Sequence, residues 1–182
     1  MSDSYMLCEY GSDEFRESER CFICTRDNSQ EKLKSNRTML KCGGLGVLVI
    51  PSTAIVGSSF TLTTLSLNVK DFKYPCIKFE FASNILATGA TRILHFQLFK
   101  QCRGSVNSFP IGPVWSFSSL IALNDTFSFH ACDCDICDDE CCVYSVIVTV
   151  AGIVPDDDND DETPGNTNIN NASLSAVIVD SV

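Results

Sequence analysis

From about Thr38 onward, short runs of β-branched and aromatic residues alternate with turn residues, and no helical periodicity of useful length accompanies them. This pattern predicts β-strands throughout the body of the chain. The expected strands are 45–50, 59–69, 76–82, 92–100, 114–118, 125–131, 142–151 and 173–179. About eight strands at such spacing predict an all-β fold, a jelly-roll-like β-sandwich.

Alternation of apolar and polar positions within these strands predicts which side chains face the core. In 76–82, Ile77, Phe79 and Phe81 share one face, and the charged side chains between them take the other. The inward set in 92–100 is Leu94, Phe96 and Leu98.

One predicted strand breaks this alternation. In 59–69 the apolar set changes parity between Leu62 and Leu65. An extra residue in one strand shifts every following side chain to the other face, so a β-bulge is expected near Thr63 and Thr64.

The segments outside these strands are polar. Residues 1–37 lack a convincing period and are interpreted as an extended N-terminal arm, an intersubunit connector, ahead of a body formed by 38–182. Within the body, 155–171 combines turn formers with clustered acids and is expected to be a loop. The apolar run 173–179 after it is expected to pair within the sandwich, because an exposed apolar edge would aggregate.

Charge and hydropathy exclude two classes of partner. The formal net charge is −10, from 13 Lys and Arg against 23 Asp and Glu, whereas a nucleic-acid binder needs a basic face. No apolar stretch reaches the roughly 18 residues of a membrane span, and the N-terminus lacks the pattern of a signal peptide. We therefore expect no nucleic acid, no membrane insertion and no classical export.

Eleven cysteines are unusual for 182 residues. Such density predicts either disulfides or metal binding, and because the number is odd, at least one thiol stays free, binds a metal or bonds another molecule. A cytosol keeps thiols reduced. Either the cysteines hold metal there, or the protein is oxidised after its cell opens.

The cysteines fall into an arm group and a body group. The arm carries Cys8, Cys21 and Cys24, which are the candidates for intersubunit disulfides. The candidates for disulfides in the body are Cys42, Cys76, Cys102, Cys132, Cys134, Cys137, Cys141 and Cys142.

Five of the body cysteines gather in 132–142. One interpretation is a disulfide-stapled loop between two strands. The alternative is a zinc or iron–sulfur module, although the interleaved carboxylates oppose the thiolates that a metal needs. The four ligands would be Cys132, Cys134, Cys137 and Cys141.

The sequence shows no constellation typical of an enzyme, and no cofactor is expected. The glycines at 43–46 precede a strand rather than a helix, and neither His95 nor His130 has a nucleophile motif beside it. A carbohydrate-binding sandwich is a further alternative, based on aromatic residues expected at the surface. These aromatic residues are Trp115, Tyr74 and Tyr10.

Several phrases between about 40 and 151 resemble a family of small clostridial proteins described as a domain of unknown function. They are LKCGG at 40–44, IP at 50–51, FTL at 60–62, PCIKFEF at 75–81, FQLFKQC at 96–102, PVWSF at 113–117 and FSFHACDC at 127–134. More distantly, a cysteine-bearing arm ahead of a β-sandwich is similar to the subunits of bacterial endospore appendages. That resemblance implies arms bonded covalently to preceding subunits, with Cys8, Cys21 and Cys24 at the arm positions.

These features together predict a structural, self-assembling subunit of an extracellular or spore-surface fibre. The arm, extended at about 3.3 Å per residue, would reach up to about 120 Å, well beyond a compact body. A head-to-tail contact that does not close grows into a filament, first through strand edges and then through disulfides. The expected partner is a second copy of the chain.

Overall fold

A computed structural model describes residues 7–9, 23–25, 37–89, 92–118, 124–134, 141–153 and 164–180. The chain divides into two compact units, Met1–Ser35 and Asn36–Val182. In the first unit, β1 (Leu7–Glu9) pairs antiparallel with β2 (Ile23–Thr25), and Cys8 lies opposite Cys24. The sequence pattern did not predict this short strand pair.

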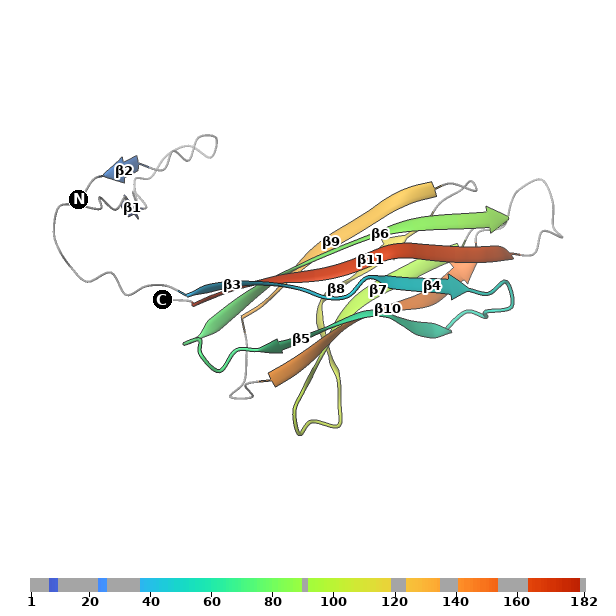
Figure 1. Cartoon of the computed structure of the whole chain (residues 1–182). Coiled ribbons are helices and arrows are strands. Elements are labelled where there is room, and N and C mark those ends of the chain that lie inside the picture. Colours follow the sequence, from blue (N-terminus) through green and yellow to red (C-terminus); the bar gives the residue numbers. More distant parts are fainter. Residues whose placement is uncertain are drawn as a thin grey trace. The chain divides into compact units, whose positions relative to one another are not determined.

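The second unit is a β-sandwich of two antiparallel sheets (Figure 1), which confirms the predicted fold class. Its strands are β3 (Thr38–Cys42), β4 (Gly46–Ile50), β5 (Ser59–Asn68), β6 (Pro75–Gly89), β7 (Arg92–Cys102), β8 (Phe109–Phe117), β9 (Asn124–Asp133), β10 (Cys141–Ile153) and β11 (Pro164–Asp180). One sheet has the order β5-β10-β7-β8. The other has the order β3-β11-β6-β9, and β4 also pairs with β11. The part of the chain that the structure describes holds no helix long and apolar enough to cross a bilayer.

The core lies between the sheets and follows the alternation expected from the sequence. Ile77, Phe79 and Phe81 of β6 are buried, as are the inward residues of β7. The parity change in β5 is also confirmed, because the pairing of β5 with β10 shifts register between Val146 and Ile147, opposite Leu62.

The structure differs from the sequence expectation mainly in strand lengths. β3 was not predicted, and β11 begins at Pro164, within the segment expected to be a loop. The first part of β11 is polar, but β4 pairs with it on one side and β6 on the other, so the ladders satisfy its backbone groups. Hydrophobic patterning does not detect a strand that is held mainly by backbone pairing.

Candidate functional site

Six body cysteines converge on one end of the sandwich, which we call the cysteine end. Antiparallel pairing brings the start of β6 beside the end of β9, and the end of β7 beside the start of β10. The body also begins here, because the backbone N–H of Asp180 at the end of β11 donates to the carbonyl of Arg37. The converging residues are Cys76, Cys102, Cys132, Cys134, Cys141 and Cys142.

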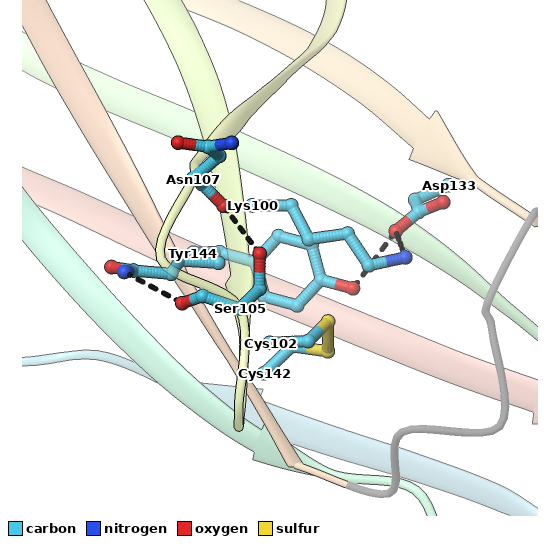
Figure 2. Close-up of a disulfide and its surroundings, with 8 residues drawn as sticks. Lys100, Cys102, Ser105, Asn107, Asp133, Cys142 and Tyr144 are labelled. Carbon is cyan, nitrogen blue, oxygen red and sulfur yellow. Dashed lines mark hydrogen bonds and ion pairs between the residues drawn. A yellow bond between two sulfur atoms is a disulfide. The ribbon is translucent and has the colours of Figure 1, made fainter.

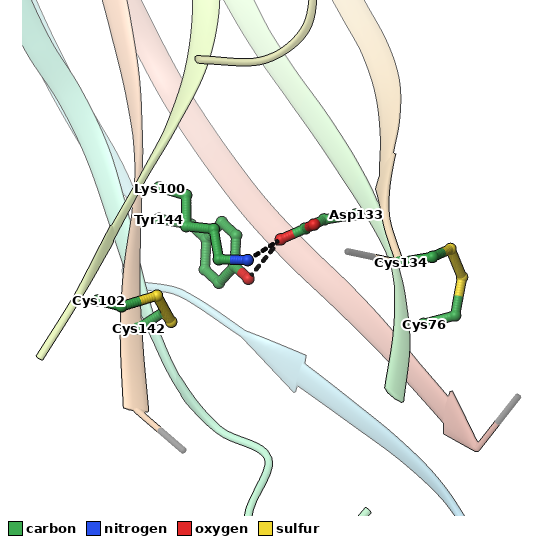
Figure 3. Close-up of polar contacts among 7 residues, drawn as sticks. All are labelled: Cys76, Lys100, Cys102, Asp133, Cys134, Cys142 and Tyr144. Atoms are coloured by element: carbon green, nitrogen blue, oxygen red, sulfur yellow. Dashed lines mark hydrogen bonds and ion pairs between the residues drawn. A yellow bond between two sulfur atoms is a disulfide. The ribbon is translucent and has the colours of Figure 1, made fainter. Parts of the chain in front are cut away.

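Two disulfides form at the cysteine end. Cys76 bonds Cys134, and Cys102 bonds Cys142 (Figure 3). Each bond joins neighbouring strands of one sheet, β6 with the residue that follows β9, and β7 with β10. The disulfides therefore attach both ends of the segment 134–142, as expected for a disulfide-stapled loop, to adjacent strands. Neither disulfide connects the two sheets.

Between the two disulfides lies a buried polar triad formed by Lys100, Asp133 and Tyr144 (Figure 3). Figure 2 shows the same triad beside the Cys102–Cys142 disulfide. The Lys100 Nζ is 2.9 Å from Asp133 Oδ2, and the Tyr144 hydroxyl donates to the same oxygen at 2.8 Å. Burial, together with the negative charge of Asp133, raises the pKa of Tyr144 above its ordinary value of 10.0. The hydroxyl therefore keeps its proton and acts as a donor.

Strand parity places all three triad residues in the core. Lys100 continues the inward series of β7, and Asp133 continues the inward series of β9 that begins with Phe129. Tyr144 lies opposite Lys100 in the β7 and β10 ladder. The triad was not expected from the sequence, although continuing the inward series of Leu94, Phe96 and Leu98 by one step places Lys100 inside.

Three cysteines in the described part of the body, 37–180 with its gaps, are free. Cys42 and Cys132 are exposed, and Cys141 is partly buried. Cys21 and Cys137 lie outside the described residues. Among the described residues, the structure therefore separates the body cysteines into a bonded set and a free set, which sequence spacing does not do.

The alternative metal module loses a ligand in this arrangement. Cys134 is committed to a disulfide, and Cys137 lies outside the described residues. Within the described ranges, no group of three or more His, Cys, Asp or Glu side chains is arranged to hold a metal ion.

The two exposed thiols lie on the outer face of the β3-β11-β6-β9 sheet. Register pairs Cys42 with Ser175, and Cys132 with Lys78. Between the two thiols, Lys78 forms an exposed ion pair with Glu80 at 2.8 Å. Their hydrogen bond raises the pKa of Lys78 and lowers the pKa of Glu80. This ion pair therefore stays charged over a wide pH range.

The expectation of a surface aromatic platform is only partly met. Trp115 is half-buried and stacks on Phe129, with 4.0 Å between ring centroids, so its ring packs against the core. Tyr74 is 80% exposed, and Tyr10 lies outside the described residues. The prediction that Trp115 is exposed was wrong, because β8 lies over the core at this point.

Comparisons with known proteins give distant structural likenesses. The VP2 subviral particle of infectious bursal disease virus aligns with 92% of this chain and 37% of its own, at 7% identity and a TM-score of 0.43. This chain thus spans little more than a third of that viral protein. A family 11 carbohydrate-binding module from Clostridium thermocellum, solved with a mixed-linked tetrasaccharide, aligns with 80% of this chain and 91% of its own, at 12% identity and a TM-score of 0.34.

At the level of sequence, no curated protein matches the chain. A family model does match it, over residues 36–179, which is nearly the whole of the second unit. The chain therefore belongs to the family described as Domain of unknown function (DUF4489).

Proposed function

We propose that the protein is a non-enzymatic, self-assembling structural subunit of an extracellular or spore-surface fibre, and that disulfides between subunits lock the fibre. The observation that carries this proposal is a body with two disulfides that nevertheless exposes two thiols, Cys42 and Cys132. The two disulfides are consistent with an oxidising environment, in which exposed thiols find partners.

The two exposed thiols are too far apart to bond each other. Cys42 lies on β3 and Cys132 on β9, and β11 and β6 lie between those strands. Three interstrand spacings amount to about 14 Å, whereas a disulfide needs Cα atoms within about 7 Å. They therefore do not bond each other, and the partners we assign to them are the arm cysteines of a second copy.

An apolar strip on the sheet edge supplies a non-covalent contact for the same assembly. β4, the residue before it and the turn that follows it expose large apolar side chains, whereas protein surfaces usually expose such side chains singly. They are Leu45, Val47, Val49, Ile55 and Val56, each more than half exposed. Among the described strands, β4 pairs only with β11, so part of its outer edge is open to strand addition by a second copy.

Electrophoresis tests the covalent part of the proposal. Boiled, non-reduced protein should run as a ladder of large species that collapses to monomer with reductant. The double variant Cys42→Ser/Cys132→Ser should lose the ladder, whereas Ser128→Ala, on the same exposed face, should keep it. Monomer under both conditions from the unmodified chain would refute the proposal.

Deletion and substitution of the arm test its role. Removing residues 1–37 should leave folded bodies that do not polymerise, as judged by electron microscopy and circular dichroism. Substituting serine for the arm cysteines in the full chain should leave assemblies that form but dissociate on boiling. Covalent ladders from the serine-substituted chain would show that body thiols bond each other directly.

A further inference from the structure

The ion pair of Lys100 and Asp133 is more deeply buried than its charges would ordinarily allow. Their side chains are 9% and 4% exposed. Lys100 lies on β7 and Asp133 on β9, so the pair connects the two sheets at a place where neither disulfide does. The attraction between buried charges only partly recovers the hydration they lose. The Lys100 ammonium, which becomes a nucleophilic amine on losing a proton, is therefore held against the Asp133 carboxylate where water is scarce.

We infer that Lys100 and Asp133 condense into an intramolecular amide, an isopeptide bond that joins β7 to β9. The reaction releases one water molecule and needs no oxidant, reductant or cofactor. In bulk water the separated ions are strongly hydrated, and that hydration opposes the amide. Here the ions lack it, so the apolar surroundings favour the uncharged product.

The triad itself supplies every atom and proton that the condensation needs. A proton first passes from the Lys100 ammonium to the Asp133 carboxylate, which gives a neutral amine and a neutral acid. The amine lone pair then attacks Cγ, and a C–N bond forms. Nζ gives up a second proton to Oδ2, the C–O bond breaks, and Oδ2 leaves as water. The 2.9 Å contact between Nζ and Oδ2 brings the amine within reach of that carbon.

Tyr144 is placed to assist at the oxygen that leaves. Its hydroxyl donates to Asp133 Oδ2 at 2.8 Å, the same atom that Lys100 contacts. Because burial keeps the phenol protonated, the hydroxyl polarises the carboxyl group and can relay a proton between Nζ and Oδ2. The Tyr144 ring packs against Phe79, with 4.4 Å between centroids, which restrains the hydroxyl.

The two disulfides restrain the strands that carry the reacting groups. Asp133 immediately precedes Cys134, and Lys100 is two residues from Cys102. Each reacting group thus lies close to the disulfide of its own sheet. The isopeptide bond would add the missing connection between sheets, and this inference does not depend on assembly into a fibre.

Intact mass spectrometry of the full chain, fully reduced and denatured, tests the bond. The expected mass is that of the unmodified chain less one water. Proteolysis should release a branched peptide that contains both Lys100 and Asp133. A mass equal to that of the unmodified chain, after prolonged incubation of the folded protein, would overturn the inference.

Three variants separate this bond from other losses of water. Lys100→Arg keeps the charge but cannot form an amide, because guanidinium stays protonated, so its mass should be unmodified. Lys100→Met serves the same purpose if arginine does not fit. Loss of water in these variants would place the reaction elsewhere and overturn the inference. Tyr144→Phe should slow the condensation at least tenfold, and an unchanged rate would overturn the role assigned to Tyr144.

Discussion

The disulfide between Cys102 and Cys142 should contribute a large share of the stability of the sandwich. The two cysteines are 40 residues apart. In the chain-entropy account, closing a loop of that length removes unfolded-state freedom worth about 4 kcal/mol. The double variant Cys102→Ala/Cys142→Ala should therefore lower the free energy of unfolding by that amount.

Urea unfolding followed by tryptophan fluorescence measures this loss. The parent should carry serine at every cysteine outside the two disulfides, so that free thiols cannot exchange, and Lys100→Arg, so that no amide between residues 100 and 133 shortens the closed loop. A loss of about 4 kcal/mol corresponds to a midpoint shift of about 2 M urea. Comparing variant and parent under reductant isolates the packing effect of replacing Cys142, which is 5% exposed.

The second disulfide is the matched control. Cys76 and Cys134 are 58 residues apart, so the same relation predicts a loss larger by only about 0.3 kcal/mol for Cys76→Ala/Cys134→Ala. A loss below about 1 kcal/mol from either oxidised pair would contradict the entropic reasoning. It would mean that the unfolded chain is already restricted near these residues.

Other sites make independent predictions. Arg92 is 2% exposed and donates to three backbone carbonyls, so Arg92→Met should lower the free energy of unfolding by about 3 kcal/mol in thermal melts, and Arg92→Lys by less. The pKa of Tyr144 is raised on folding, so the stability contributed by its protonated hydroxyl is complete below pH 10 and declines as the pH rises further. Tyr144→Phe should therefore reduce the fall in melting temperature at alkaline pH. A Cβ at Gly46 would collide with the Leu62 carbonyl, so Gly46→Ala should cost more than about 2 kcal/mol in urea unfolding, whereas Gly44→Ala, with open space around it, should cost less than about 0.5 kcal/mol.

The inward faces of the strands were predictable because burial on a pleated strand follows a period of two. Phe79 and Leu98 are buried where the alternation placed them, and the bulge in β5 followed from one break in the pattern. β11 was only half predicted. Its polar first half is held by ladders on both sides, and such pairing leaves no hydrophobic signal in the sequence.

The candidate site was predicted in composition but not in connectivity. Cysteine density indicated disulfides, and disulfides are present, yet no spacing rule could pair Cys76 with Cys134 across 58 residues. The polar triad was not foreseen, because lysine is ordinarily a surface residue and only the position of Lys100 in the alternation of β7 indicates its burial.

By itself, the sequence determined the properties that depend on neighbours along the chain: the amphipathic strands, their inward faces, the bulge and the gathering of cysteines in a few segments. The tertiary structure alone decided which distant residues meet. The disulfide partners depend on the register between strands, and the contact of Lys100 with Asp133 depends on how one sheet lies over the other. Those arrangements minimise the free energy of the whole core, so no local pattern encodes them.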